Sequence, residues 1–318
     1  MRLTQGAPGA RVLAFGGYQP ADVVTNDDLA RRIDTNDEWI QSRVGIKERR
    51  IAGPQESEID LAVQAGGKAL AASGLSSSDI DLVIVATCTL EAQIPNASAR
   101  VANRLGIEAP GAFDVNAACA GFCYALAAAS DAVRAGTATN VLVVGTEKLS
   151  QWVDWDDRTT AVIFADGAGA AVVGPSDTPR IGPVAWGSAG DKAEAIAVKD
   201  RGSFLQQEGQ TVFRWATTAL HPVAKLACER AGVDPAELAA FVPHQANLRI
   251  VEAIARKLGA DNAVVARDIV LAGNTSAASI PLALSRMIER GEVPSGGLAL
   301  LLGFGAGLTY ASQVIELP

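Results

Sequence analysis

Short apolar runs recur along the chain, and glycine or a polar residue bounds each of them. The clearest runs cover residues 82–86, 141–144 and 298–302. They are rich in valine, isoleucine and leucine and too short for isolated helices, so they predict buried β-strands. The uncharged stretch 298–315 reaches the length of a membrane span, but Gly303, Gly305 and Gly307 interrupt it. We therefore expect a buried strand, a glycine turn and a second strand there.

Alanine-rich stretches with apolar residues at helical spacing lie between these runs. The predicted helices cover residues 59–73, 121–134, 217–231, 248–258 and 280–290. Strands that alternate with helices are typical of layered α/β folds, in which helices cover the faces of a sheet.

An internal repeat is the strongest organisational signal in the chain. Residues 72–86 align with residues 230–244 without a gap, and Gly74 then stands opposite Gly232. In the same register Ala86 stands opposite His244, so a titratable side chain occupies the position in one copy only. The repeat predicts a duplicated fold.

A second pair of segments extends the repeat. Cys119 precedes Gly136 by 17 residues, and Asn274 precedes Gly291 by the same 17 residues. We expect a boundary near residues 172–183, with an N-terminal half over residues 1–174 and a C-terminal half over residues 175–318. If the two sheets face each other, Cys119, His244 and Asn274 converge near the pseudo-twofold axis.

Length and composition agree with this architecture. The chain has 318 residues, of which 49% are hydrophobic and 19% charged, so it can bury a large core and does not resemble a disordered or coiled-coil protein. The net charge of −8 opposes binding to nucleic acid or to an anionic membrane, and we expect neither partner.

The four cysteines show no paired framework, which indicates a reducing compartment. The first residues lack the basic stretch and apolar run of a signal peptide, so we expect a cytoplasmic protein.

Cys119 is the best candidate nucleophile. It follows a predicted strand and begins an apolar helix, and the free amides and dipole of a helix N-terminus favour the thiolate. The other interpretation is a buried inert cysteine, which we keep for Cys88, Cys123 and Cys228.

His244 and Asn274 are candidate polar partners, since each follows a predicted strand or turn of the second half. A structural imidazole and a helix N-cap are the alternatives. The glycine-rich segment 303–307 indicates either a tight turn or a backbone oxyanion hole. No Cys/His pairs stand at zinc spacing, so no metal site is expected.

Seven phrases of the sequence carry a family resemblance. They are Asp37-Glu-Trp-Ile, Arg43-Val-Gly-Ile-Lys-Glu-Arg, Ala118-Cys-Ala-Gly-Phe, Asp166-Gly-Ala-Gly-Ala, Pro243-His-Gln-Ala-Asn-Leu-Arg-Ile, Gly273-Asn-Thr-Ser-Ala-Ala-Ser-Ile-Pro and Gly303-Phe-Gly-Ala-Gly. Together, and in this order from about Arg11 to Leu317, they resemble β-ketoacyl-acyl-carrier-protein synthase III.

The resemblance implies a thiolase-like α/β fold with five αβαβα layers, a homodimer and no cofactor. It also implies an acyltransferase reaction. An acyl group passes from coenzyme A (CoA) to Cys119, and the carbanion left when malonyl carrier protein loses carbon dioxide attacks it to give a 3-oxoacyl carrier protein. His244 and Asn274 would donate hydrogen bonds to the enolate, and the amides of Cys119 and Ala306 would hold the oxyanion of acyl transfer.

Further positions follow from the resemblance. Those that would bind CoA are Trp39, Arg43, Arg158, Gly209, Phe213, Asn247 and Arg249, with Trp39 and Arg158 on the two faces of the adenine. Those that would face the acyl carrier protein are Arg214, Arg249, Arg256 and Lys257. Those that would line the primer pocket are Leu90, Ile94, Phe164 and Phe304, with Ile94 at its far end, in a loop that crosses the dimer interface.

Other readings remain open at this point. A condensing enzyme of polyketide or other secondary metabolism, including the chalcone type, shares the Cys-His-Asn set and differs in its acceptor. A papain-like protease shares the set too, but it is normally exported, disulfide-bonded and not duplicated. A non-catalytic carrier-protein-binding subunit would lose the nucleophile, and Cys119 is present.

Overall fold

Two five-stranded mixed sheets form the centre of the computed structural model, which describes residues 4–200 and 202–318. The first sheet has the order β1 (Gly9–Tyr18), β7 (Asp166–Ser176), β6 (Val141–Lys148), β4 (Leu82–Ala86), β5 (Gly111–Val115). The second has the order β8 (Ala185–Ser188), β14 (Thr309–Glu316), β13 (Leu298–Gly305), β11 (Leu238–Pro243), β12 (Val264–Val265).

The two sheets match strand for strand. In each sheet, in the order given above, the first strand pairs antiparallel with the second and the second with the third. The third strand pairs parallel with the fourth and the fourth with the fifth. This is the pattern that a duplicated fold predicts. The strands expected at 82–86, 141–144 and 298–302 are all present, and the glycine-interrupted stretch forms β13, a short turn and β14.

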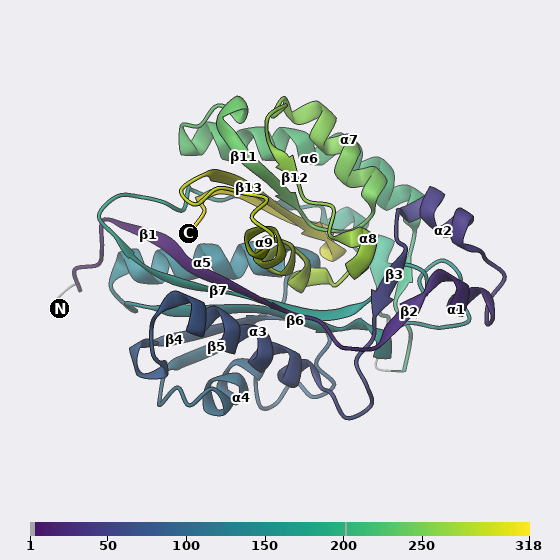
Figure 1. The fold of residues 1–318 in the computed structure, drawn as a ribbon, viewed down its shortest axis with the longest axis horizontal. Helices are drawn as coiled ribbons and strands as arrows, with labels where there is room; N and C mark the ends of the chain where they lie inside the picture. Colours follow the sequence, from purple (N-terminus) through teal and green to yellow (C-terminus); the bar gives the residue numbers. More distant parts are fainter. Residues whose placement is uncertain (1–3, 201) are drawn as a thin grey trace.

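Helices lie in three layers around the sheets (Figure 1). α5 (Gly121–Ala135) and α9 (Ser279–Glu289) lie between the sheets and pack against both. The outer face of the first sheet is covered by α3 (Glu58–Ser73) and α4 (Ala97–Arg104), and that of the second by α6 (Gly209–Ala231) and α7 (Leu248–Leu258). The result is the predicted five-layer αβαβα arrangement, with the largest apolar cluster between the sheets.

The repeated segments have the same local structure. α3 ends at Gly74 and α6 at Gly232, with φ angles of 75° and 68°, a left-handed conformation that glycine adopts at little cost. Both glycines are followed by a short turn and then by a central strand, β4 or β11. The residues that align in the sequence repeat therefore also occupy equivalent positions in the two halves of the structure. The division at residue 174 stays a prediction.

α6 begins at Gly209, whereas the sequence predicts a helix from residue 217. The two additional turns carry Val212 and Ala216, both buried, so packing on the second sheet extends the helix. The extension also contains Phe213 and Arg214.

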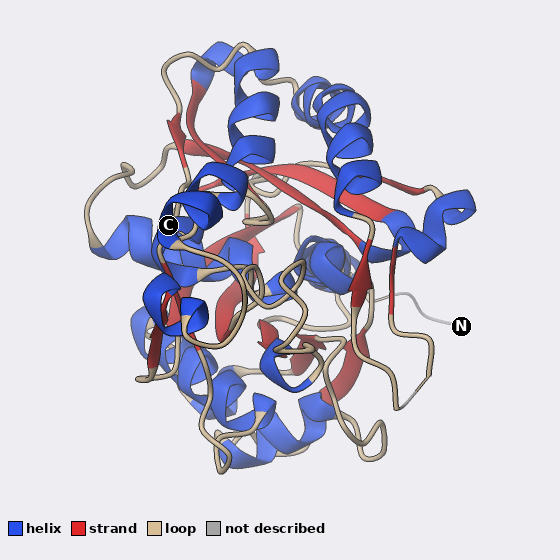
Figure 2. Ribbon diagram, turned by 90° about the vertical axis from the view of Figure 1, so that its right-hand side faces the viewer, coloured by secondary structure: helices blue, strands red, loops and turns tan. Residues whose placement is uncertain are grey.

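The remaining elements are short. They are β2 (Val23–Thr25), α1 (Asn26–Ala30), α2 (Asp37–Val44), β3 (Glu48–Arg50), β9 (Ile196–Ala197), β10 (Gln206–Gln207) and α8 (Ile269–Ala272). The segment from β2 to β3 projects from the two main sheets at one end of the molecule (Figure 1). Loops fill the middle of that end (Figure 2). Within the described ranges, none of the helices has the length and apolar character needed to cross a membrane.

Candidate active site

Cys119 lies at the junction between the first sheet and a buried helix. The chain leaves β5 at Val115, forms a single 3-10 turn over Ala118–Ala120 and enters α5 at Gly121. Ala118 has a φ of 43°, a left-handed conformation that costs a non-glycine residue roughly 1–2 kcal/mol. This strained turn places Cys119 beside the start of α5, as the sequence predicted.

His244 and Asn274 come to the same place from the second half. His244 directly follows β11, and its backbone N–H donates to Leu302 O at 2.8 Å. Asn274 lies between α8 and α9, where its backbone exchanges hydrogen bonds with Ile163 O (3.0 Å) and Ala165 N–H (2.9 Å) of the first half. Cys119, His244 and Asn274 all line one cavity of about 660 Å³. The convergence expected from the repeat is thus present.

The His244 ring is held on two sides. Its Nδ1 lies 2.7 Å from Ser279 Oγ, and its edge meets the ring of Phe304 at a centroid distance of 5.3 Å. Ser279 Oγ also accepts the Gln245 N–H at 3.3 Å, so the hydroxyl proton is free to be donated to Nδ1. When the hydroxyl donates to Nδ1, the His244 proton is on Nε2.

Burial determines the charge of His244. The ring is 1% exposed, and desolvation lowers its pKa to about 3. A neutral imidazole with its proton on Nε2 can donate one hydrogen bond and is a weak base.

Asn274 is fixed in a complementary way. Its side-chain oxygen Oδ1 accepts the Ser276 N–H at 2.8 Å, which orients the amide and leaves Nδ2 as its donor. His244 and Asn274 thus bring two neutral donors to the cavity that Cys119 also lines.

The Cys119 thiol differs from expectation. The helix N-terminus was expected to favour the thiolate, but burial raises the pKa of Cys119 to about 11. Hydrogen bonds from the Ser276 side chain and from the backbone at Ala306 and at Cys119 itself lower that pKa only in part. Desolvation is the largest cause, and the charge of nearby Glu147 raises the pKa further. In the free protein Cys119 is therefore a thiol.

Space at Cys119 depends on Gly305 of β13. A Cβ at this position would lie 2.7 Å from Cys119 Sγ, closer than any non-bonded contact allows. The glycine-rich turn thus brings backbone next to the nucleophile without a side chain, as the oxyanion-hole interpretation requires.

The cavity wall contains all seven positions that the resemblance assigns to CoA. They are Trp39, Arg43, Arg158, Gly209, Phe213, Asn247 and Arg249. The Arg158 guanidinium carbon lies 4.8 Å from the Trp39 ring centroid, and that of Arg249 lies 5.2 Å from the Phe213 ring centroid. Trp39 and Arg158 are thus in contact here, so a ring bound between them requires that they separate.

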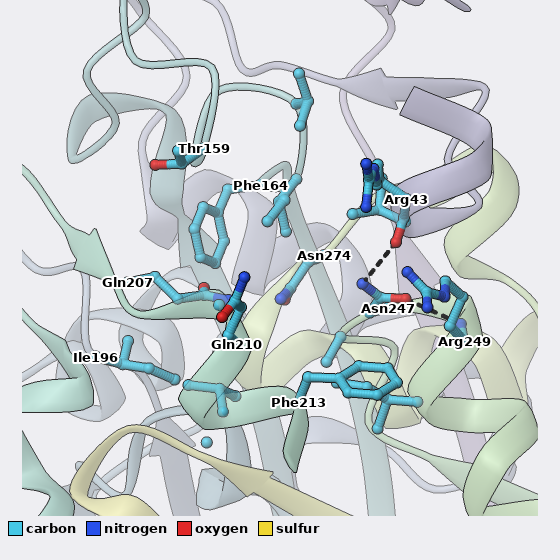
Figure 3. Close-up of a pocket in the computed structure, with 18 of the residues that line it drawn as sticks. Arg43, Thr159, Phe164, Ile196, Gln207, Gln210, Phe213, Asn247, Arg249 and Asn274 are labelled. Atoms are coloured by element: carbon cyan, nitrogen blue, oxygen red, sulfur yellow. Dashed lines mark hydrogen bonds between the residues drawn. The ribbon is translucent and has the colours of Figure 1, made fainter. Parts of the chain in front are cut away.

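Asn247 joins the two sides of this wall (Figure 3). Its Nδ2 donates to Arg43 O at 3.1 Å, and its Oδ1 accepts the Arg249 N–H at 2.9 Å, capping α7. The end of α2 is thereby fixed to the start of α7.

The remaining predicted positions divide between the cavity and the surface. Phe164, Phe304 and Arg214 line the cavity, whereas Leu90, Ile94, Arg256 and Lys257 do not. Ile94 is 89% exposed. In this single chain nothing brings the Ile94 side chain to the acyl pocket. Arg256 and Lys257 lie in the last turn of α7, where Lys257 Nζ donates to Thr217 O of α6.

Several site residues were not singled out from the sequence. Thr159, Val162, Ile163, Ile196, Gln207 and Gln210 also line the cavity. Ser276 and Ser279 lie two and five residues after Asn274, in the same small-residue segment. Glu147, a lone acid at the end of an apolar run, is buried near Cys119 and carried a signal that was not used.

Comparison with known proteins identifies the family. Residues 113–190 match the family model "3-Oxoacyl-[acyl-carrier-protein (ACP)] synthase III", and residues 228–317 match the model of its C-terminal part. The chain is 58% identical to β-ketoacyl-[acyl-carrier-protein] synthase III 4 of Streptomyces coelicolor, over 98% of this chain and 99% of that protein. It is 49% identical to the mycobacterial β-ketoacyl-[acyl-carrier-protein] synthase III of Mycobacterium avium, over 99% and 98%.

Solved structures show the same fold. The priming β-ketosynthase of the R1128 polyketide pathway superposes with a TM-score of 0.97 at 44% identity, covering 100% of this chain and 98% of that one. The 3-oxoacyl-[acyl-carrier-protein] synthase III of Aquifex aeolicus has a TM-score of 0.92 at 40% identity, covering 97% and 100%. On sequence and fold together, this thiolase-fold chain belongs to the β-ketoacyl-[acyl-carrier-protein] synthase III family of condensing acyltransferases.

Proposed function

We propose that this enzyme loads an acyl group from CoA onto Cys119 and condenses it with malonyl carrier protein, releasing carbon dioxide and a 3-oxoacyl carrier protein. The single observation that carries the proposal is the shared cavity. One nucleophile and two neutral donors from opposite halves of the fold line it, together with a wall of arginines and aromatic rings. Such a reaction would initiate fatty acid synthesis.

In the first half-reaction Cys119 Sγ attacks the thioester carbonyl and the CoA thiolate leaves. The developing oxyanion is met by the backbone amides of Cys119 and Ala306, both of which lower the pKa of the Cys119 thiol in the free protein. Backbone donors are independent of side-chain identity, so an alanine at position 306 serves as well as a glycine.

In the second half-reaction malonyl carrier protein loses carbon dioxide, and negative charge develops on its thioester oxygen. His244 Nε2–H and Asn274 Nδ2–H donate to this oxygen. The low pKa of His244 suits this role, because a neutral imidazole keeps its proton and leaves the charge on the substrate. Each such donor typically contributes about 3–4 kcal/mol to the transition state.

The cavity wall supports a nucleotide-bearing substrate. Arg43, Arg158 and Arg249 present guanidinium groups beside the Trp39 and Phe213 rings. Guanidinium groups pair with phosphates and stack on adenine, so CoA can bind here through both its phosphate groups and its adenine ring.

The carrier protein is proposed to dock over Arg214, Arg249, Arg256 and Lys257. Arg214 and Arg249 line the cavity, and Arg256 and Lys257 continue the same pair of outer helices, α6 and α7. A basic face on a chain of net charge −8 favours encounter with an acidic partner.

We propose a cytoplasmic homodimer that uses no cofactor beyond its two substrates. The four cysteines are all free, as expected in a reducing compartment. Phe164 and Phe304 line the acyl pocket of one subunit, and the exposed Ile94, with Leu90 from the same loop, is proposed to complete the pocket of the partner subunit.

The experiment adds the substrates in turn. Acyl-CoA alone should give an enzyme heavier by one acyl group at Cys119, and malonyl carrier protein should then discharge it as 3-oxoacyl carrier protein. An enzyme that takes up the acyl group and never condenses it would contradict the proposal and would favour a non-catalytic carrier-protein-binding role.

A second candidate is priming of a polyketide pathway. The observation that favours it is the TM-score of 0.97 to a polyketide priming β-ketosynthase. Competition between malonyl carrier proteins of the fatty acid and polyketide types, with one primer at fixed concentration, separates the two. A preference for the polyketide carrier protein by kcat/KM would favour this candidate.

A further inference from the structure

Glu147 is a buried carboxylate that the proposed reaction does not yet use. It lies near the end of β6 with 0% of its surface exposed. Its oxygen Oε2 accepts hydrogen bonds from Thr89 Oγ1 (2.7 Å), Thr87 Oγ1 (3.1 Å) and Cys88 N–H (3.1 Å). The other oxygen, Oε1, accepts from Ser276 Oγ at 3.0 Å and from Cys88 Sγ at 3.4 Å.

Ser276 connects this carboxylate to the nucleophile. Its turn packs against the turn that carries Cys119, and its hydroxyl donates to Glu147 Oε1 at 3.0 Å. A serine hydroxyl has one proton, so while it donates to Glu147 its oxygen is free to accept the Cys119 S–H. The Ser276 hydroxyl thus links the turn of Cys119 to Glu147 Oε1.

No cation neutralises Glu147. Across residues 4–200 and 202–318, no lysine, arginine or histidine nitrogen forms an ion pair with it. The titratable groups that face it are the thiols of Cys88, after β4, and Cys119. Lys148, next in sequence, directs its ammonium to the carbonyls of Gly53 and Glu56.

The charge environment suits a proton acceptor. Burial raises the pKa of Glu147, while its five hydrogen-bond donors favour the ionised form. His244 cannot fill this role, because burial lowers its pKa to about 3. A buried thiol whose pKa is about 11 needs such an acceptor before it can attack a thioester.

We propose that Glu147 takes the Cys119 proton through the Ser276 hydroxyl during acyl transfer and returns it when condensation frees the thiolate. Glu147 touches no substrate, so it is a positioning residue that acts through Ser276. The inference rests on the proposed function and adds the route of the proton.

The protons balance over the cycle. The Cys119 S–H bond breaks as its proton passes to Ser276 Oγ, and the Ser276 hydroxyl proton passes to Glu147. The new S–C bond forms, the bond from the acyl carbon to CoA sulfur breaks, and the CoA thiolate takes a proton from solvent. In condensation the enolate carbon attacks the acyl carbon, the bond to Cys119 breaks, and the thiolate regains its proton from Glu147 by the reverse path.

Coupled titration gives the relay a signature. Between the pKa of Glu147 beside the neutral thiol and its higher pKa beside the thiolate, the pair shares one proton, so the thiolate fraction is independent of pH. The rate of Cys119 alkylation by iodoacetamide should therefore have a flat section near neutral pH in the parent. In Glu147→Gln the section should disappear, and the rate should rise about tenfold per pH unit below the thiol pKa. Glu147→Asp, which keeps a carboxylate, should restore it.

Ser276→Ala tests the middle of the path and keeps the Cβ at a position where φ is 48°. It should lower the flat section about tenfold, the equivalent of one pKa unit, since the thiolate loses its hydroxyl donor. Cys88→Ala is the matched control, because it removes a donor to the same carboxylate oxygen and leaves the path intact. Its profile should stay within about twofold of the parent.

Infrared difference spectra follow the proton itself. Acylation of the parent should produce a carboxylic-acid C=O band that Glu147→Gln lacks, and malonyl carrier protein should abolish it. A parent profile without a flat section, an acylated parent without the band, or a Cys88→Ala profile shifted as far as that of Ser276→Ala would each overturn the relay. If Glu147→Gln does not fold, Ser276→Ala and the parent spectra decide.

Alkylation of Cys119 requires no acyl-CoA, so the relay is tested separately from the proposed function. An enzyme that shows the flat section but accepts no acyl-CoA would retain the relay and contradict the condensing reaction. An enzyme that condenses normally but lacks the flat section would support the condensing reaction and contradict the relay.

Discussion

His244 Nδ1 lies 2.7 Å from Ser279 Oγ, and this contact between the end of β11 and the start of α9 holds the imidazole ring by one nitrogen. Ser279 Oγ accepts the Gln245 N–H, and when it gives its own proton to Nδ1, Nε2–H remains for the substrate. The Ser279 hydroxyl thus helps to orient His244 Nε2–H as a donor.

Ser279→Ala should slow condensation about tenfold while acyl loading of Cys119 stays near the parent rate, because without its hydroxyl partner His244 also populates the other tautomer. Single-turnover assays of the two half-reactions provide the comparison. Parent decarboxylation should also be independent of pH between about pH 5 and pH 8, since the imidazole does not charge in that range. Equal loss of loading and condensation would contradict the tautomer role.

Cys119→Ser should abolish acyl transfer, because the site provides no base strong enough to activate a hydroxyl. Intact-mass spectrometry after incubation with acyl-CoA should show no adduct. Cys228→Ala, which alters a thiol on α6 outside the cavity lining, serves as the control and should acylate like the parent. A normal adduct on Cys119→Ser, or a parent adduct at Cys88, Cys123 or Cys228, would show that another group is the nucleophile.

Asn274→Ala and His244→Ala should separate the half-reactions. Each removes a donor to the enolate, so decarboxylation of malonyl carrier protein should fall about 100-fold or more. Acylation should survive better, since the backbone donors at Cys119 and Ala306 remain. Carbon dioxide release and acyl-enzyme mass are the two measurements. Parallel losses would mean that these residues chiefly serve Cys119.

Charge reversal at Arg256 and Lys257 should raise KM for malonyl carrier protein several-fold and leave acyl-CoA loading nearly unchanged, because neither side chain lines the cavity. The effect should weaken with added salt. Arg134→Glu, at an exposed position at the end of α5, is the control for net charge, and Tm confirms folding of the variant that loses the Lys257 contact with Thr217. A parent KM that does not respond to salt would eliminate this docking face.

Ile94→Phe should narrow primer choice towards acetyl-CoA, and the parent should use isobutyryl- or butyryl-CoA at least as well as acetyl-CoA. Hydrophobic pockets discriminate by only about 1–3 kcal/mol per methylene, so we expect a shifted profile and no absolute switch. The measurement is kcat/KM over a panel of primers, with Val264→Phe at another exposed apolar position as the control. An unaltered profile, or a parent that strongly prefers acetyl-CoA, would show that Ile94 does not gate the pocket.

Local sequence determined the elements and their repetition. The runs at 82–86 and 298–302 are strands because β-branched and leucine-rich segments of that length bury themselves in sheets. Gly74 and Gly232 end helices because both positions need a positive φ. Equal spacing of Cys119 and Asn274 from their closing glycines placed both residues beside the starts of equivalent helices, α5 and α9.

Tertiary structure decided the chemistry of the side chains. The helix start at Cys119 is readable in the sequence, yet its pKa is raised to about 11 because the fold desolvates the thiol and brings Glu147 near it. Glu147 and Ser276 are 129 residues apart in the chain, and only packing of the two halves brings their oxygens within 3.0 Å. Ile94 shows the opposite case, since its side chain is 89% exposed in the single chain, and its place in a primer pocket depends on the proposed partner subunit. Periodicity specifies which face a residue occupies, whereas desolvation and contact depend on what packs over that face.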